Sequence, residues 1–370
     1  MSQSIREPIR VLHVVTNMSY GGLENLLMNY YRNIDKNIIQ FDFLTHVDIK
    51  QDFEMEIEEL GGKIYRLPRM NPFSLKYRKQ LDKFFDHHKE YKIIHSHLDC
   101  MAGVPLKIAK KKNIPIRIAH SHSSNQNRNL KYIIKLLYKK SIPQYATQLF
   151  SCGKKAGDWM FDGNKYVIMQ NAIDANAFRY SIEKSKEYRE KFDISEEYII
   201  GHVGQFRVEK NHLFLIEVFA EILKIDEKCK LLLIGKGPQM EEVKIKVEEL
   251  QIADKVIMLG ARADIEKLMQ MMDVFVLPSI YEGLPVTMIE AQASGLPCVI
   301  SDRVPLECKI IDEVQQISLE ANPSEWARAI LAYKNYDRKD TYIEIQKARF
   351  DIKENVKWLE EFYCNNYEKE

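Results

Sequence analysis

Short apolar runs rich in β-branched residues alternate along this chain with longer segments of helical periodicity. The apolar runs predict buried strands at 9–15, 40–45, 63–66, 92–95, 116–119, 148–152 and 166–169, and again at 199–203, 230–234, 255–259, 274–277 and 298–301. Strands of this kind, separated by helices, are typical of parallel sheets that are covered by helices on both faces. The pattern therefore predicts an α/β fold with two doubly wound, Rossmann-like parallel-sheet domains.

One irregular stretch interrupts this alternation, between Asn171 and Glu197. It is rich in Asn and Asp, continues into charged residues, and ends where the strand pattern restarts. We expect a first domain over residues 1–175 and a second domain over residues 176–351. The remaining segment, 352–370, has the apolar spacing of an amphipathic helix.

Composition narrows the class of protein. A chain of 370 residues with 45% hydrophobic and 29% charged residues is typical of a globular enzyme with two domains of ordinary size. No apolar run approaches the roughly 20 residues that cross a bilayer, and residues 1–10 are too polar for a signal peptide, so we expect a cytoplasmic protein. The six cysteines include no closely spaced pair, which argues against a zinc or disulfide framework.

The net charge of +1 conceals an uneven distribution. Residues 1–175 contain 27 Lys and Arg against 17 Asp and Glu, and the remainder contains 27 against 36. Positive charge concentrates at 107–112 and at 128–140, where lysines interleave with aliphatic and tyrosine side chains. Two interpretations of segment 128–140 stay open: a helix that lies on anionic lipid at the cell membrane, or a solvated helix whose apolar face packs inward. Because no DNA- or RNA-binding motif is present, nucleic acid is not an expected partner.

Two carboxylates, Glu282 and Glu290, flank the junction between an apolar strand and a helix. Pro278 ends the strand, and Gly295 closes the helix. Amides at a helix start attract anions, and carboxylates accept hydrogen bonds from hydroxyls, so a ligand with phosphates and hydroxyls suits this junction. Glu290 has a second interpretation, because Thr287 and Glu290 have the spacing of a capping box. Glu282 stands in a loop with no helix to cap.

Other candidate residues also follow predicted strands, where ligands bind to open parallel sheets. Gly21 and Gly22 follow the first strand and allow the backbone to approach a phosphate or sugar closely. Arg207 and Lys210 follow the first strand of the second domain, and cations of this kind stabilise the charge on a departing phosphate. Arg262 follows a later strand, where it can either stack on a base or stay solvated.

The segment 282–297 closely resembles the paired-glutamate signature of retaining glycosyltransferase family four. That family has the GT-B fold, in which two domains face each other across a cleft. The resemblance implies that Glu282 contacts the donor sugar and that Glu290 contacts the nucleotide ribose. We also expect the amides after Glu282, at Gly283, Leu284 and Val286, to stabilise the leaving diphosphate together with Lys210 and Arg207.

Further motifs follow in the order typical of this family. Lys210 aligns with the lysine that neutralises the donor diphosphate, whereas the usual arginine position holds Gln205, and Arg207 lies two residues further on. The glycine pair is similar to the family's loop that faces the donor phosphates and the acceptor. Arg262 lies in the loop that the resemblance places beside the nucleotide base. By the same resemblance, segment 352–370 packs back on the first domain.

Histidines follow two strands of the predicted first domain, as the pairs His95 with His97 and His120 with His122. Such pairs could suggest a metal, but no cysteine or carboxylate accompanies them at the spacing of metal ligands, and the family does not need a metal. We therefore expect no metal site, and we expect these side chains to bind hydroxyls of the acceptor or of the donor sugar. His122 is the first candidate among them for a catalytic role.

Together these features predict a metal-independent glycosyltransferase that moves a sugar, with retention, from a nucleotide donor to a lipid-linked saccharide. We expect a UDP-linked donor and no further cofactor. The segments 118–122 and 291–298 resemble those of bacterial capsule and exopolysaccharide enzymes. We therefore expect a peripheral enzyme that acts at the inner face of the cell membrane. Two alternatives stay open: a non-catalytic GT-B protein that binds a saccharide or partner, and a nucleotide-sugar isomerase.

Overall fold

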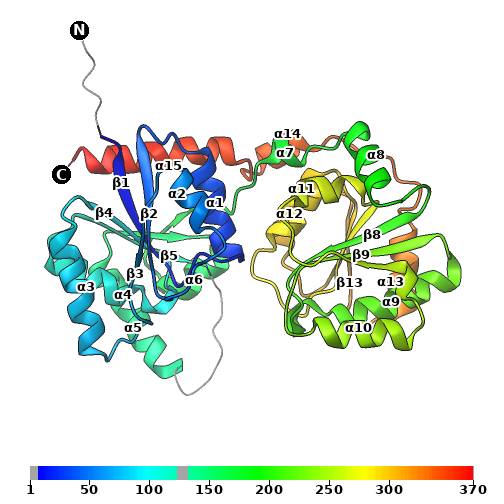
Figure 1. The fold of residues 1–370 in the computed structure, drawn as a ribbon, viewed down its shortest axis with the longest axis horizontal. Helices are drawn as coiled ribbons and strands as arrows, with labels where there is room; N and C mark the ends of the chain where they lie inside the picture. The colour runs from blue at the N-terminus through cyan, green and yellow to red at the C-terminus, as the bar shows by residue number, and fades with distance from the viewer. Residues whose placement is uncertain (1–6, 123–131, 370) are drawn as a thin grey trace, which may run out of the picture. The chain divides into compact units, whose positions relative to one another are not determined.

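The computed structural model describes residues 7–122 and 132–369 and shows a chain folded into two compact units. Unit 1 contains the described residues up to Ala172 together with those from Ile352 onward, and unit 2 spans Ile173–Asp351. The chain therefore leaves the first unit once and returns to it at its C-terminal end. Figure 1 shows that each unit is built around its own sheet.

Unit 1 contains a seven-stranded parallel sheet in the order β3-β2-β1-β4-β5-β6-β7. Its strands are β1 (Ile9–Val14), β2 (Ile39–Thr45), β3 (Ile64–Arg66), β4 (Ile93–Ser96), β5 (Ile116–Ser121), β6 (Gln148–Ser151) and β7 (Val167–Ile168). The strand order reverses between β1 and β4, which are direct neighbours. Their register aligns His13 with His95, and this alignment places two polar side chains side by side at the reversal.

Helices cover both faces of this sheet, and each face has its own hydrophobic core. They are α1 (Gly22–Asn33), α2 (Glu54–Glu59), α3 (Leu75–His87), the short η1 (Asp99–Ala102), α4 (Gly103–Lys111), α5 (Tyr132–Tyr145), α6 (Lys154–Phe161) and α15 (Ile352–Tyr367). Leu359 and Tyr363 of α15 pack into the same core as Tyr30 of α1. In Figure 1, α15 is the red helix that lies along unit 1.

Unit 2 contains a six-stranded parallel sheet in the order β10-β9-β8-β11-β12-β13. Its strands are β8 (Tyr198–Val203), β9 (Cys229–Ile234), β10 (Val256–Met258), β11 (Val274–Leu277), β12 (Cys298–Ser301) and β13 (Val314–Ile317). The order reverses between β8 and β11. Each sheet therefore has one switch point, and ligands of open parallel sheets bind beyond the strand ends at such a point.

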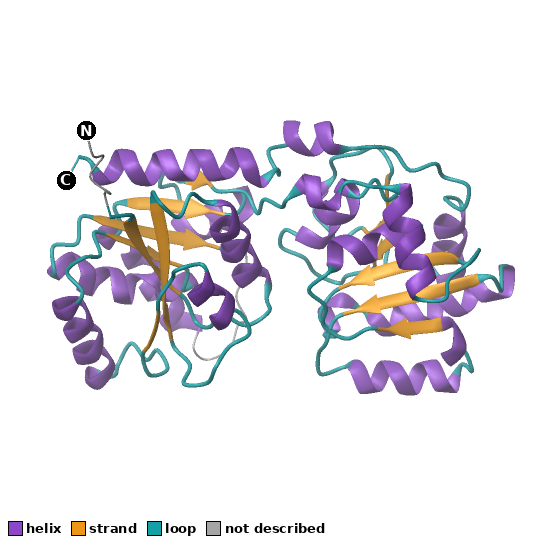
Figure 2. Cartoon of the chain, turned by 45° about the horizontal axis from the view of Figure 1, so that its top comes forward, coloured by secondary structure: helices purple, strands orange, loops and turns teal. Residues whose placement is uncertain are grey.

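The helices of unit 2 likewise enclose a hydrophobic core on each face of the sheet, and Figure 2 shows them around the strands. They are α7 (Ala175–Phe178), α8 (Ile182–Lys191), η2 (Val208–Lys210), α9 (His212–Ile225), α10 (Met240–Glu249), η3 (Ala253–Lys255), α11 (Ile265–Leu268), η4 (Met269–Met271), α12 (Val286–Ala293), η5 (Leu306–Cys308), α13 (Pro323–Leu331) and α14 (Tyr342–Lys347). The longest of them, α9, starts directly after Lys210 and Asn211.

All twelve predicted strands are present, and the prediction of an α/β fold with two parallel sheets is confirmed. The sequence pattern missed β13, which lies at the edge of its sheet beside β12. Its sequence, Val314-Gln-Gln-Ile317, is half polar because an edge strand is only partly buried. Within the described parts of the chain, no helix is long and apolar enough to cross a membrane.

Candidate active site

The loops after β8 and β11, the two strands at the switch point of unit 2, carry Lys210 and Glu282. Lys210 is the last residue of η2, and Glu282 stands between β11 and α12. Nζ of Lys210 lies 2.6 Å from Oε1 of Glu282, and the two side chains are 20% and 10% exposed. Two residues predicted for the site from separate motifs therefore form a largely buried ion pair.

Neighbouring groups fix the carboxylate of Glu282. The hydroxyl of Ser279 donates a hydrogen bond to the same oxygen, Oε1, at 2.6 Å. The two loops are also joined through their backbones, because the amide of Ile280 donates to the carbonyl of Glu209 at 2.8 Å. Among the described residues, none donates a hydrogen bond to the second carboxylate oxygen, Oε2, so that atom can accept one from a ligand hydroxyl.

The helix that follows this loop starts at Val286, with Pro285 as its N-cap residue. Thr287 is therefore inside the helix, and its hydroxyl is buried without a partner among the described residues. The predicted capping box of Thr287 with Glu290 is wrong, because a capping Thr must precede the first helical turn. Capping of the helix therefore does not explain why a carboxylate stands at position 290.

Glu290 lies in the second half of α12 and is partly buried. Burial, and to a smaller degree repulsion from Glu266 of α11, raises the pKa of Glu290 to about 7. A carboxyl group with a raised pKa beside a strand-end loop is more often functional than one with an ordinary value. The role of Glu290 at a nucleotide ribose stays a prediction.

The diphosphate site was predicted in the backbone between Glu282 and α12. The side chains of Leu284 and Val286 pack against the core of unit 2, so only their amides can face a ligand. Gly283 is exposed, and a Cβ there would meet no atom of the described chain within 4 Å. The amides of Gly283, Leu284 and Val286 donate no hydrogen bond to a described backbone carbonyl. Such a run of free amides at a helix start suits an anion, and the binding of a diphosphate there stays a prediction.

Two further cations of unit 2 were predicted to contact the donor. Arg207 and Gln205 are both exposed, and Arg207 forms no ion pair with any residue in the described part of the chain. Arg262 is already bound, because its guanidinium donates two hydrogen bonds to the carboxylate of Asp264, at 2.8 and 2.7 Å. The contacts of Arg207 with a diphosphate and of Arg262 with a base stay predictions.

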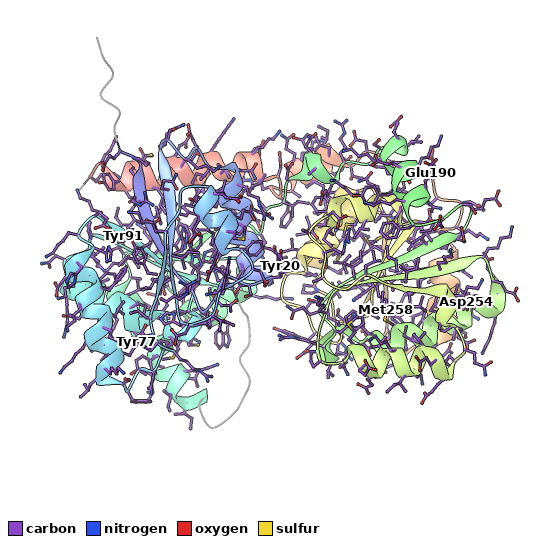
Figure 3. All side chains as sticks on the ribbon, viewed as in Figure 1. Tyr20, Tyr77, Tyr91, Glu190, Asp254 and Met258 are labelled. Atoms are coloured by element: carbon purple, nitrogen blue, oxygen red, sulfur yellow. The ribbon has the colours of Figure 1, made fainter. Side chains whose placement is uncertain are left out.

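The glycine pair of unit 1 leads into α1 with an extended backbone, since φ of Gly21 is −163°. No atom of the described residues lies within 4 Å of a Cβ added at Gly22, whereas one at Gly21 would clash with Oε2 of Glu24. Burial raises the pKa of Glu24 to about 7. Figure 3 labels Tyr20 on the same loop, where its amide donates to Asp52 at 3.1 Å. The loop thus presents exposed backbone with two carboxyl groups beside it, and its contact with a phosphate or sugar stays a prediction.

A cluster of five histidines occupies the switch point of unit 1, at the carboxyl ends of β1, β4 and β5. The members are His13, His95, His97, His120 and His122, all buried except the partly exposed His122. Neighbouring ring centroids are 4.0 to 5.3 Å apart. We call this group the histidine cluster. It contains the four predicted histidines and one that the sequence pattern did not single out.

Hydrogen bonds connect the histidine cluster internally. His97 bonds through Nε2 to Nδ1 of His13 at 3.0 Å and through Nδ1 to Nε2 of His122 at 2.9 Å. Nε2 of His95 lies 3.2 Å from Nδ1 of His120. Desolvation is the main cause that lowers the pKa of all five side chains. The imidazoles are therefore neutral near pH 7, each with one donor and one acceptor nitrogen.

Several residues near the two switch points escaped prediction. His13 lies inside the apolar run 9–15, and only the pairing of β1 with β4 brings it to the cluster. In unit 2, His202 and His212 pack edge to face with centroids 4.7 Å apart. Burial, and to a smaller degree the charge of Lys210, lowers the pKa of His212 to about 2. For His13 and His202, the signal in the sequence was a histidine interrupting an otherwise apolar strand, whereas His212 begins α9.

The two parallel sheets and the charged switch point of unit 2 define a class of protein. The structure of Anabaena Alr3699/HepE in complex with UDP and glucose matches this chain with a TM-score of 0.77 and 16% identity, over 96% of this chain and 99% of that one. The fold is that of the GT-B glycosyltransferases.

Sequence comparison then identifies the family. The pattern of "Glycosyl transferases group 1" matches residues 184–349. EpsF of Bacillus subtilis (strain 168), named as a glycosyltransferase, is 32% identical over 98% of both chains. The Escherichia coli UDP-Gal:alpha-D-GlcNAc-diphosphoundecaprenol alpha-1,3-galactosyltransferase is 24% identical over 63% of this chain and 64% of its own length. The chain belongs to the group 1 glycosyl transferases, and the predicted family and enzyme class are confirmed.

Proposed function

We propose that this glycosyltransferase moves a sugar from a UDP-linked donor to a lipid-linked saccharide, with retention at the anomeric carbon, in the assembly of a bacterial exopolysaccharide or capsule. The observation that carries the proposal is the ion pair of Lys210 with Glu282 at the switch point of unit 2. Beside this pair lie the free amides that follow Glu282, so cationic and hydroxyl-binding groups stand next to each other. A diphosphate joined to a sugar has this combination of charge and hydroxyls.

In the proposed reaction, the bond from the anomeric carbon to the diphosphate oxygen breaks while the acceptor hydroxyl forms a new bond to that carbon. The acceptor proton passes to the departing diphosphate oxygen on the same face of the sugar. Lys210 and the amides of α12 stabilise the charge that develops on the diphosphate, which is why the proposed transfer needs no metal. Glu282 orients the sugar through Oε2, because Oε1 is held by Lys210 and Ser279.

A lipid-linked acceptor is supported by the Escherichia coli relative, whose name gives a diphosphoundecaprenol acceptor. The described part of segment 128–140 adds a surface suited to lipid. In α5, Ile133 and Leu137 are 69% and 66% exposed and stand one helical turn apart. These two side chains do not pack inward, whereas Tyr138 of the same helix packs against a core of unit 1. Arg128 and Lys131 lie outside the described residues.

A groove of about 530 Å³ lies between α3, α4 and α5, beside Leu137. Its basic lining residues are Arg78, Lys79, Lys83, Lys107 and Lys111. Exposed aliphatic side chains next to several lysines favour a surface covered with anionic headgroups. We propose that α5 and this basic groove dock the enzyme on the inner face of the cell membrane.

Membrane docking is tested by sedimentation with vesicles of phosphatidylglycerol and phosphatidylcholine. We expect Lys107→Glu combined with Lys111→Glu to release the protein from the anionic vesicles. The matched control is Lys184→Glu with Lys186→Glu, which reverses two exposed charges on α8 of unit 2. Equal partitioning of the two double variants would contradict docking through the basic groove.

Sugar transfer is tested with a panel of nucleotide sugars and a polyprenyl-diphosphate saccharide acceptor. A preferred donor should raise the melting temperature by mass action, and the same donor should give a product attached to the lipid. Glu282→Ala should abolish transfer, whereas Glu209→Gln, an exposed carboxylate on the neighbouring η2, should retain it. Normal turnover by Glu282→Ala would overturn the assignment, and rearrangement of the donor without an acceptor would indicate an isomerase.

A further inference from the structure

We propose that the histidine cluster of unit 1 binds one divalent transition-metal ion of the zinc type through His97, His120 and His122. The proposed transfer uses Lys210 and backbone amides of unit 2 as counter-charges, so it does not depend on this ion. Along the sequence, neither histidine pair has a cysteine or carboxylate at the spacing of metal ligands. In the fold, however, the two pairs come together, because β4 and β5 are paired neighbours whose register aligns His95 with Ile118.

Strand geometry places the three side chains on one face of the sheet. Residues two apart on a strand point to the same side, so His120 and His122 share a face, as do His95 and His97. The register of β4 with β5 brings His97 level with His120. One candidate nitrogen from each of His97, His120 and His122 lies within 4.8 Å of the other two. Three imidazoles at this separation are the ligand set of a zinc site that keeps one position open.

The short distances within the cluster also suit coordination. Nδ1 of His97 lies 2.9 Å from Nε2 of His122, while two nitrogens on one tetrahedral zinc ion stand roughly 3.3 Å apart. A small ring rotation therefore converts the hydrogen-bonded pair into a pair of ligands. Nε2 of His120 is buried and has no hydrogen-bond partner among the described residues. Buried polar atoms normally have a partner, and a bound ion would be the partner of this nitrogen.

The remaining nitrogens are held by outer partners, as metal-binding histidines usually are. His120 bonds through Nδ1 to His95, whose own Nδ1 lies 2.8 Å from the hydroxyl of Tyr363 on α15. His97 bonds through Nε2 to His13 at 3.0 Å. With protons on these outer-facing nitrogens, Nδ1 of His97 and Nε2 of His120 keep free lone pairs for the ion.

A second trio, His13 with His95 and His97, also has its nitrogens within 4.8 Å, but the structure favours the first. All three members of the second trio are buried, and His95 already uses both ring nitrogens. His122 is partly exposed, so the first trio alone offers an ion a route from solvent and an open coordination position.

The test uses the full chain, stripped with a chelator and titrated with Co²⁺ and Zn²⁺ in the absence of nucleotide sugar. We expect visible ligand-field absorption of one protein-bound Co²⁺ per chain, its displacement by Zn²⁺, and a rise in melting temperature with Zn²⁺. His122→Ala, at the partly exposed end, and His120→Gln should each weaken Co²⁺ binding more than tenfold. His95→Gln, which changes only an outer partner, should weaken it by about 10- to 100-fold.

The matched control is His87→Gln, because His87 is exposed at the end of α3 and, within the described residues, bonds only to a backbone carbonyl. It should bind Co²⁺ as the unchanged chain does. Circular dichroism of each variant separates loss of ligand from loss of fold, and His122→Ala is the safer variant because its side chain is partly exposed. Absence of the absorption band, or equal affinity of His87→Gln and His122→Ala, would overturn the proposal. Because no donor is present, this outcome is independent of whether sugar transfer is detected.

Discussion

The two switch points of this protein have the same topology but contrasting polar chemistry. In unit 2, the loops after the central strands bring a cation and an anion together, with free backbone amides beside them. In unit 1, the equivalent strand ends carry neutral imidazoles that bond mainly to one another. A parallel sheet therefore supplies the place for a ligand, whereas the side chains at the strand ends decide which ligand suits it.

The contrast depends most on the charge of Lys210. Lys210→Met keeps the length of the side chain but removes the cation that we propose faces a departing diphosphate. We expect kcat/KM for sugar transfer to fall by about 10²- to 10³-fold. Arg207→Met, which removes an exposed cation on the same loop, should cost about tenfold or less. Equal losses would show that Arg207 replaces the arginine missing at Gln205, and near-normal transfer by Lys210→Met would contradict the mechanism.

Glu290→Gln tests whether the partly buried carboxyl group of Glu290 in unit 2 contributes to donor binding. Its pKa is raised from 4.5 to about 7, so folding is favoured below pH 4.5 and loses stability as pH rises through that interval. The amide should add up to about 3 kcal/mol of stability at pH 8 and little at pH 4. Donor affinity, measured by calorimetry, should fall about tenfold. Unchanged affinity would leave Glu290 without its predicted ribose contact.

Glu24→Gln makes the corresponding change in unit 1, where the carboxyl group stands in the first turn of α1. Its pKa is raised from 4.5 to about 7 by burial, so the direction of the pH effect is the same. The gain at pH 8 should be smaller, about 2 kcal/mol, because the positive end of a helix already favours a carboxylate. Urea unfolding at pH 4 and pH 8 measures it, and a larger gain than for Glu290→Gln would contradict this ranking.

His212→Phe should have the smallest effect. Both ring nitrogens of His212 are buried without a partner in the described chain, and the ring stacks on Phe206 at 4.0 Å. A phenyl ring keeps the stacking and removes two unsatisfied groups, so stability at pH 8 should rise by about 1 kcal/mol. Because the pKa is lowered from 6.5 to about 2, the wild type loses stability as pH falls below 6.5, and the gain should grow towards pH 5. Lower stability of the variant at pH 8 would mean that the nitrogens are satisfied by water.

Local sequence patterns were sufficient for most of the fold. Continuous apolar runs predicted every described strand except the half-polar β13. A strand that is buried on both faces of a sheet needs apolar side chains at consecutive positions, so its sequence is recognisable. The strand-end positions of Lys210 and Glu282 followed from the same pattern. The start of α12 was misjudged, because the spacing of Thr287 and Glu290 fits a capping box whether or not the helix begins at that point.

By itself, the sequence determined the two α/β sheets, the loops that carry the candidate residues and the glycosyltransferase family. Only the tertiary structure decided which of those residues meet. Lys210 and Glu282 are 72 positions apart, and His13 is 84 positions from His97. Hydrophobic periodicity is a local property, whereas contact between strand ends depends on the order in which strands pair. That order brings β8 beside β11 and β1 beside β4, and it thereby creates both the ion pair and the histidine cluster.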